Sequence, residues 1–368
     1  MKIGITGANG FLGFHLRAFL YAQGRDEVRL ATRETFADPA ALDGFVRDLD
    51  GVAHLAGVNR GDEAGLEAAN ASLASELVAA FRRTGARPSL AFANSTHIER
   101  ETGYGRGKRA AAERLAEWAA DAGTWFANFV LPNIFGEFGR PFYNSVVATF
   151  CHQLANGHTP EIHVDAELEL MHAQVVASYC AEALTQDKCG MFRLPGETIR
   201  VSELLERLRY MHGRYAVAKV IPDLSDPLDL RLFNTLRSYL YPGHYPVSLD
   251  LRSDARGSLF EAVKAMQGGQ TFLSTSHPGI TRGNHYHLRK VERFLVVSGN
   301  AEIRVRKLFS GDLKTFVVSG NVPCYVDMPA FHTHSITNVG TDELLTLFWS
   351  NEIFDPADAD TFTEAVDP

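Results

Sequence analysis

The chain has 368 residues, of which 45% are hydrophobic and 22% are charged, and its formal net charge is −8. This composition is typical of a globular protein with enough residues for two domains. The negative charge excludes a general basic surface for nucleic acid, so any phosphate must bind at a local site. No segment approaches ~18 consecutive apolar residues, and the first strand begins before a signal peptide would fit. We therefore expect a soluble cytoplasmic protein that binds neither nucleic acid nor membranes, with its scattered cysteines reduced.

The first motif is a glycine-rich turn between a strand and a helix. Residues 2–6 are rich in β-branched side chains, residues 11–21 are expected to be helical, and the junction reads G-A-N-G-F-L-G. The first glycine provides the turn, the second lets the main chain approach a phosphate, and the third lets the helix pack on the strand. A tight turn without a ligand is the alternative. The position at the head of a βαβ unit favours a dinucleotide site formed by Gly7, Asn9, Gly10, Phe11, Leu12 and Gly13.

The next two strands carry further cofactor candidates. A strand over residues 27–32 is followed by Arg33. An acidic residue usually binds the ribose hydroxyls of NAD at this point, whereas arginine suits a 2′-phosphate. Although Arg33 could simply be a solvated loop residue, it favours NADPH over NADH. The strand over residues 51–57 ends in a small-residue turn, where we expect Leu55, Ala56 and Gly57 to lie along the cofactor, braced by Asn70 from the next helix.

Candidate catalytic residues follow the next strand, residues 90–94. Ser95 and Thr96 come directly after it, and Tyr104-Gly-Arg-Gly-Lys108 lies further on. The carboxyl ends of strands in a doubly wound sheet line the ligand crevice. Tyr104 and Lys108 are one helical turn apart, so the ammonium would stabilise tyrosinate and help the phenol exchange a proton with a sugar or alcohol oxygen. We predict that Ser95 or Thr96 binds that oxygen, and that Tyr104 and Lys108 also contact the cofactor.

Together these motifs resemble the extended short-chain dehydrogenases/reductases, NAD(P)-dependent enzymes that act on nucleotide sugars. The resemblance implies an α/β Rossmann-type doubly wound parallel sheet, with Pro132 at the cofactor and Asn133 at the substrate. It also implies substrate contacts from Asn144 and from Arg140, for which a solvated loop position is an equal alternative.

Two positions depart from the pattern of that family. Its members often have arginine where this chain has Leu131, and an aspartate-rich segment where this chain has Gln174. The missing polar contact at Leu131 indicates a different substrate or a different substrate pose, and Gln174 is a second departure.

The hydrophobic pattern changes near residue 246. Upstream, residues 201–211 are expected to form an amphipathic helix capped by Ser202, and residues 241–246 a linker. Downstream, short alternating strands such as residues 294–298, 301–307 and 315–318 are separated by glycine-containing turns, which is typical of a β-barrel or jelly roll. We therefore predict an NAD(P)-binding domain over residues 1–245 and an all-β domain over residues 246–368.

The all-β part contains a candidate metal site. His285 and His287 point to the same face of a strand, Glu292 follows, and His334 comes later. Three imidazoles and a carboxylate suit zinc or another divalent cation. The spacing resembles the cupin family, whose ligand positions correspond to His285, His287, Glu292 and His334. His332 falls outside that set and is open to interpretation as a base, a supporting residue or an exposed side chain.

The combination of both halves resembles a family of bifunctional capsular polysaccharide biosynthesis enzymes. Stretches that carry this resemblance include residues 54–60, 143–151 and 351–356. It implies that the cupin epimerises C3 of a UDP-linked 2-acetamido-2,6-dideoxy-4-ulose and that the reductase then reduces C4 with NADPH. The first alternative keeps only the reductase activity and treats the cupin as a metal-stiffened dimerisation module. A homodimer is expected in either case. A nucleotide-sugar sensor without enzymatic activity is the second alternative, against which Tyr104 and Lys108 argue.

Overall fold

The computed structural model describes residues 1–24, 27–186, 188–255 and 257–367. Its contacts divide the chain into two compact units: unit 1 contains residues 1–135 and 167–199, and unit 2 contains residues 136–166 and 200–368. Unit 2 therefore combines helices from before residue 245 with the strands that follow it. The predicted boundary between residues 245 and 246, which rests on the change from helical to strand pattern, stays a prediction.

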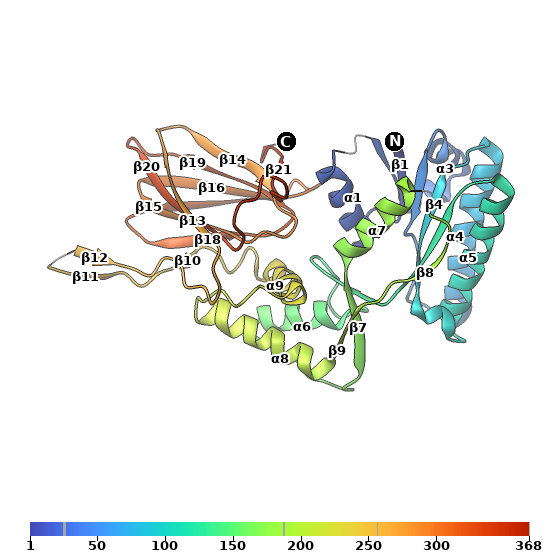
Figure 1. Ribbon diagram of the computed structural model, residues 1–368, viewed down its shortest axis with the longest axis horizontal. Coiled ribbons are helices and arrows are strands. Elements are labelled where there is room, and N and C mark those ends of the chain that lie inside the picture. Colours follow the sequence, from blue (N-terminus) through green and yellow to red (C-terminus); the bar gives the residue numbers. More distant parts are fainter. Residues whose placement is uncertain (25–26, 187, 256, 368) are drawn as a thin grey trace. The chain divides into compact units, whose positions relative to one another are not determined.

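Unit 1 is built on a Rossmann-type parallel sheet, as predicted (Figure 1). Within the described residues the sheet has six strands in the order β2-β1-β3-β4-β5-β8, all paired in parallel. The chain switches sides between β2 and β3, so the carboxyl ends of β1 and β3 border the crevice where such folds bind ligands. The strands are β1 (Lys2–Thr6), β2 (Glu27–Ala31), β3 (Gly51–His54), β4 (Ser89–Ser95), β5 (Phe126–Leu131) and β8 (Gly190–Arg193).

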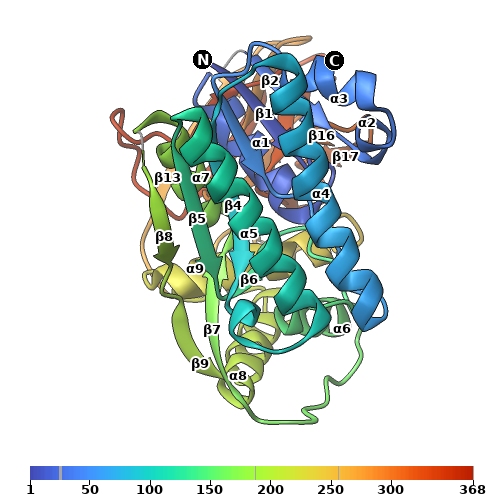
Figure 2. The same ribbon diagram turned by 90° about the vertical axis from the view of Figure 1, so that its right-hand side faces the viewer.

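Helices cover both faces of this sheet (Figure 2). On one face, α1 (Phe11–Ala22) and α7 (Ala173–Thr185) bury apolar side chains against the strands. On the other face lie α3 (Pro39–Val46), α4 (Glu63–Thr84) and α5 (Gly103–Ala122). Burial on both faces explains why these strands are almost continuously apolar. The short helices α2 (Arg33–Ala37) and η1 (Thr96–Glu99) follow β2 and β4.

A small sheet pairs β6 (Asn133–Phe135), β7 (Glu167–His172) and β9 (Glu197–Arg200). Unit 2 contains α6 (Val146–Ala155), α8 (Val201–His212), the π-helical turn η2 (Gly213–Val217) and α9 (Pro227–Leu240). The predicted helix over residues 201–211 is confirmed, but its predicted cap is wrong. Ser202 lies inside α8, and the Asp165 carboxylate accepts hydrogen bonds from the Ser202 N–H and hydroxyl at 2.9 and 3.0 Å.

The β part of unit 2 is a sandwich of antiparallel sheets, which confirms the predicted all-β architecture. Strands with inward apolar residues such as Phe294, Val305 and Ile336 form its core. One sheet has the order β10-β18-β15-β20-β13 and the other β17-β16-β19-β14-β21, while β11 and β12 form a separate hairpin. Their bounds are β10 (Val247–Ser248), β11 (Arg252–Asp254), β12 (Gly257–Leu259), β13 (Gln270–Ser276), β14 (Thr281–Tyr286), β15 (Glu292–Ser298), β16 (Asn300–Lys307), β17 (Leu313–Ser319), β18 (Cys324–Met328), β19 (His332–Asn338), β20 (Leu344–Ser350) and β21 (Phe362–Thr363).

Among the described residues, no helix has an apolar stretch long enough to cross a bilayer. Cys151, Cys180 and Cys324 are buried and Cys189 is exposed, and all four are free thiols, as expected.

Candidate active site and candidate metal centre

The glycine turn after β1 has the close packing that its sequence predicts. A Cβ atom on Gly13 would lie 2.3 Å from the Gly7 carbonyl oxygen, and Gly7 itself has a φ of +66°. The Gly10 N–H donates to the Gly7 carbonyl at 2.9 Å, which closes the turn. Gly10 then caps α1 without a side-chain hydrogen bond, so the first N–H groups of the helix are suited to an anion. Asn9 is exposed beside the turn, with Phe11 and Leu12 partly buried at the helix start.

The turn after β3 packs directly against this glycine turn. A Cβ atom on Gly7 would lie 2.8 Å from the Ala56 nitrogen. The Asn70 side chain accepts from the Val58 N–H at 3.1 Å and donates to the Val58 carbonyl at 2.7 Å, so it braces the turn as predicted. A Cβ atom on Gly57 would lie 3.1 Å from Asn70 Oδ1 and 3.6 Å from Lys108 Nζ. The structure thus brings Gly57, Asn70 and Lys108 together.

A buried histidine supports the same edge, a role that the sequence reading missed. His54 Nδ1 lies 2.8 Å from Thr6 Oγ1, and that hydroxyl also accepts from the Ala56 N–H at 3.2 Å. The His54 ring stacks on Phe92 at 5.5 Å between centroids. Burial, and secondarily the charge of Lys108, lower the pKa of His54 to about 3. The ring is therefore neutral and fills the space between Thr6 and Phe92. His54 directly precedes the Leu55-Ala56-Gly57 turn, so its position in the sequence could have indicated this supporting role.

Tyr104 and Lys108 lie in the first turns of α5. Lys108 is buried, its Nζ donates to the Ala93 carbonyl at 2.6 Å, and it sits 4.4 Å from the centre of the Phe92 ring. Burial lowers the pKa of Lys108 to about 7. Ser95 ends β4, and its Oγ accepts from the His97 N–H at 3.2 Å, which leaves the hydroxyl proton available. Lys108 is therefore anchored to the strand that presents Ser95 and, one residue on, Thr96.

Glycines fix where α5 begins. A Cβ atom on Gly103 would lie 1.9 Å from the Glu63 carbonyl oxygen, and one on Gly107 would lie 2.9 Å from the Glu67 backbone. The Gly103 N–H donates to the Glu63 carboxylate, and Thr102 caps the helix by accepting from the Gly105 N–H at 3.2 Å. Because α4 and α5 touch backbone to backbone, the turn that carries Tyr104 is held rigidly.

Arg33 lies where the sequence predicts, at the carboxyl end of β2. It is exposed and is the first residue of α2, with Thr32 as the N-cap. Glu34, which the sequence reading did not consider, shares the turn. The Thr32 hydroxyl donates to the Glu34 carboxylate, and this hydrogen bond lowers the pKa of Glu34. A cation and an anion are therefore both present where a ribose or its phosphate would lie.

The residues after β5 have packing roles in unit 1. Leu131 is 3% exposed and belongs to the core under α1 and α7. Pro132 is buried at the strand end, while the Asn133 amide donates to the Glu169 carbonyl at 3.3 Å. Gln174 donates from Nε2 to the His15 carbonyl at 2.9 Å and so ties α7 to α1. Of the two departures from the family pattern, Leu131 therefore packs in the core and Gln174 links two helices.

Arg140 and Asn144, the other predicted substrate residues, belong to unit 2. Both are exposed, and the Arg140 guanidinium lies 5.1 Å from the centre of the Tyr143 ring. Their substrate roles stay predictions.

The four predicted metal ligands come together in the β-sandwich. One ligand atom from each of His285, His287, Glu292 and His334 lies within 4.8 Å of all the others. Glu292 Oε2 is 3.1 Å from Nε2 of His287, 3.3 Å from that of His334 and 3.7 Å from that of His285. Burial opposes ionisation of Glu292, but its interactions with the three neighbouring imidazoles outweigh burial and hold the pKa of the carboxyl well below its usual range.

The far nitrogens of two ligand rings show that this cluster fits a cation. His287 Nδ1 lies 2.5 Å from the Asp360 carbonyl and His334 Nδ1 lies 3.0 Å from the His332 carbonyl. A carbonyl can only accept, so both Nδ1 atoms carry a proton, and Nε2 is the nitrogen by which each ring would bind a cation at the centre of the cluster. Burial lowers the pKa of His334 to about 4, which keeps that ring neutral. The donor set matches a zinc-type site.

His332 is buried rather than exposed. Its Nδ1 donates to the Ala330 carbonyl at 2.9 Å, and its ring packs on Tyr241 at 4.7 Å between centroids. Lys307 pairs with it across β16 and β19. Among the interpretations that the sequence left open, the exposed side chain is excluded.

Comparison with known proteins agrees with both halves. The model of the NAD-dependent epimerase/dehydratase family matches residues 3–192, more than half of the chain. The chain belongs to this family. A second model, the polysaccharide biosynthesis C-terminal domain, matches residues 252–362.

Several known proteins match the chain over nearly its whole length. It is 35% identical to the UDP-2-acetamido-2,6-beta-L-arabino-hexul-4-ose reductase of Pseudomonas aeruginosa, over 100% of this chain and 99% of the relative. The crystal structure of the capsular polysaccharide assembling protein CapF from Staphylococcus aureus is 30% identical, with a TM-score of 0.65, and the match covers 99% of this chain and 100% of that one. CapF with the inhibitor 3-isopropenyl-tropolone has 29% identity, a TM-score of 0.60 and the same coverage. The predicted resemblance of the fused chain is therefore confirmed.

Proposed function

We propose that the chain is a bifunctional nucleotide-sugar enzyme. In this proposal unit 2 epimerises C3 of a UDP-linked 2-acetamido-2,6-dideoxy-4-ulose, and unit 1 reduces the C4 ketone with NADPH, which gives a product of the UDP-N-acetyl-L-talosamine type. One observation carries the proposal: a Tyr104–Lys108 arrangement and a three-histidine, one-carboxylate cluster occur together in a chain that is 35% identical along its whole length to a hexul-4-ose reductase.

The reduction needs a hydride and a proton at the two ends of the C4 carbonyl. Bound NADPH would supply the hydride. Tyr104 would donate the proton to O4, while the Ser95 hydroxyl, whose oxygen already accepts from the His97 N–H, would donate a hydrogen bond to the same oxygen. The negative charge of a bound dinucleotide would favour the ammonium form of Lys108 and so promote ionisation of Tyr104.

Preference for NADPH is supported by the exposed guanidinium of Arg33 at the end of β2. We expect Arg33→Ala to raise the KM for NADPH by roughly one to two decades, because a charge-assisted contact is typically worth ~1.5–3 kcal/mol, and to change the KM for NADH little. Steady-state kinetics with both cofactors measure this. Arg29→Ala is the control, because the Arg29 guanidinium forms an ion pair with the Glu27 carboxylate in the same strand. If Arg33→Ala raised the KM for NADPH and NADH equally, Arg33 would not determine the choice between the two cofactors. The neighbouring Glu34 would then favour NADH.

The epimerisation needs a stabilised enolate and a proton carrier. A C4 ketone makes the C3 proton acidic, and a divalent cation held by His285, His287, Glu292 and His334 would stabilise negative charge on O4. The later reduction removes the ketone and so prevents the new C3 configuration from reverting. If the metal instead only stiffens the sandwich, the enzyme is a 4-keto reductase with a structural β domain. That is the second candidate, and the compact ligand cluster is equally compatible with it.

The direct test is incubation with NADPH and UDP-linked 4-keto sugars, with the products identified by NMR. The proposal predicts NADPH oxidation together with inversion at C3. Reduction without inversion would support the second candidate. Absence of both reactions would favour a nucleotide-sugar sensor without enzymatic activity. Sedimentation of the same sample measures whether the chain forms the predicted homodimer.

A further inference from the structure

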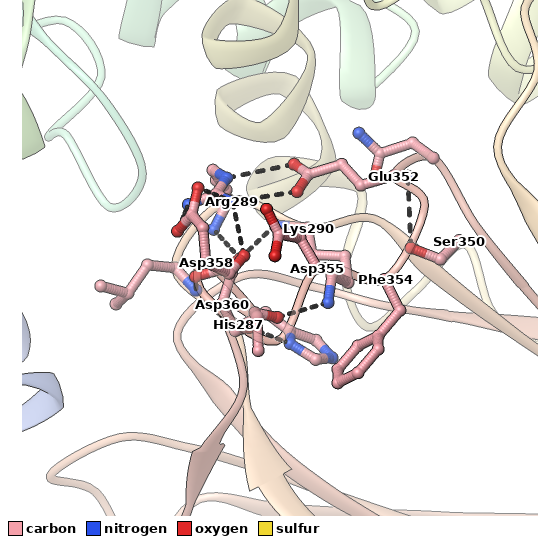
Figure 3. A network of polar contacts seen from close by, with 12 residues as sticks. His287, Arg289, Lys290, Ser350, Glu352, Phe354, Asp355, Asp358 and Asp360 are labelled. Atoms are coloured by element: carbon pink, nitrogen blue, oxygen red, sulfur yellow. Dashed lines mark hydrogen bonds and ion pairs between the residues drawn. The ribbon is translucent and has the colours of Figure 1, made fainter.

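The loop between two of the metal ligands is held by a segment from the far end of the chain. His287 follows β14 and Glu292 begins β15, so residues 288–291 connect two ligands. Residues 351–363 run beside this loop, and the last of them pair with β14, with His285 opposite Thr363. Figure 3 shows Glu352, Asp358 and Asp360 of this C-terminal segment gathered around the loop.

The amide groups of the loop are bonded to side chains of this segment. The Asp360 carboxylate accepts from the N–H groups of Leu288, Arg289 and Lys290 at 3.0, 3.0 and 2.7 Å. The N–H of the next residue, Val291, donates to Asn351 Oδ1 at 2.8 Å. Asp360 is only 5% exposed, so these are buried, charge-assisted hydrogen bonds that fix the course of the loop.

The same residue also orients a metal ligand through its main chain. The Asp360 carbonyl accepts the Nδ1 proton of His287, and a φ of +42° at Asp360 lets its carbonyl and its carboxylate both face the loop. The Lys290 ammonium donates to the neighbouring Ala359 carbonyl at 2.6 Å, which adds a further link between the loop and the segment. One residue therefore sets both the ring orientation of His287 and the path of the chain from His287 to Glu292.

We propose that Asp360 is a positioning residue of the metal centre, and that docking of residues 351–363 and metal binding stabilise each other. The proposal rests on the metal site of the proposed function. Hydrogen-bond partners of metal-bound histidines typically change metal affinity by about 10–100-fold when altered. Because coupling between two binding events is reciprocal, a metal ion should strengthen the docking of the segment as much as the docked segment strengthens metal binding.

The test compares Asp360→Asn with Asp355→Asn in the full-length protein. Asparagine at 360 replaces one acceptor oxygen by an NH₂ group that faces backbone donors, so the loop must shift. Asp355 is the matched control, because it loses the same charge but is exposed, and its carboxylate accepts from the Ala357 N–H within the C-terminal segment rather than from the loop. Competition of Zn²⁺ against a chromophoric chelator should show affinity about 10–100-fold weaker for Asp360→Asn and within about twofold of wild type for Asp355→Asn.

Hydrogen exchange on the wild type adds a readout that needs no variant, should Asp360→Asn fail to fold. Zn²⁺ should slow exchange of the amides of residues 288–290. Unchanged exchange at these amides, or equal Zn²⁺ affinity in Asp360→Asn and wild type, would overturn the positioning role. Absence of Zn²⁺ binding by the wild type would instead overturn the metal centre of the proposed function, so the two failures are distinguishable.

Discussion

Tyr104→Phe is expected to abolish reduction of the 4-keto sugar while NADPH still binds. The phenol is the proposed proton donor to O4, and general acid catalysis typically contributes about 10²–10⁴-fold to a rate. The cofactor turn is built from backbone contacts of Gly7, Gly13 and Ala56, none of which involves the phenol. The loss should therefore appear in kcat and in kcat/KM alike, as for an interaction made only in the transition state.

Cofactor fluorescence measures NADPH binding, and loss of absorbance at the nicotinamide band measures turnover. Tyr21→Phe is the matched control, because this tyrosine is 43% exposed near the far end of α1 and loses the same hydroxyl. Turnover of Tyr104→Phe at the wild-type rate would remove Tyr104 from the mechanism. Loss of NADPH binding in this variant would mean that the tyrosine serves the cofactor rather than the proton transfer.

Local patterns in the sequence predicted the parts of both sites whose chemistry is local. Gly7, Gly10 and Gly13 form one turn, and a Cβ atom on Gly13 would collide with the Gly7 carbonyl, so their spacing alone encodes the close packing. His285 and His287 share a face because strand side chains alternate. The alternating pattern of the last third likewise predicted antiparallel sheets.

Contacts between distant segments could not be predicted in this way. His54 and Thr6 are 48 residues apart, and His287 and Asp360 are 73 residues apart, so no periodicity within either segment links them. Ser202 has a side chain that favours a helix cap, yet Asp165, 37 residues earlier, supplies the carboxylate. The Ser202 hydroxyl and the Asp165 carboxylate are both chemically suited to accept a hydrogen bond at the start of α8, and tertiary packing places Asp165 there.

The departures at Leu131 and Gln174 illustrate a further limit. Leu131 was interpreted from the sequence as a change at the substrate, because family members often have arginine there, and Gln174 was interpreted as a second departure. In the structure Leu131 fills the core, and Gln174 hydrogen-bonds the His15 main chain. A residue that differs from a family pattern can therefore have a packing role that only the three-dimensional neighbours disclose.

The double change His285→Ala with His287→Ala is expected to abolish C3 proton exchange. Enolisation requires no hydride, so in D₂O without NADPH the wild type should incorporate deuterium at C3 of the keto sugar, as measured by NMR. Removing two ligands from the cluster destroys the site that would stabilise the enolate. Exchange should then fall to the rate of the sugar without enzyme.

Metal binding also contributes to folding, so this variant needs a separate check of its fold. NADPH binding by unit 1 and circular dichroism provide it. His158→Ala with His163→Ala is the matched control, because both rings are exposed and lie outside the β-sandwich. If the folded, metal-free variant exchanges the C3 proton at the wild-type rate, the metal is structural and the epimerisation belongs elsewhere. If the wild type shows no exchange, unit 2 is not an epimerase for that sugar, and reduction by Tyr104 in unit 1 is the remaining activity.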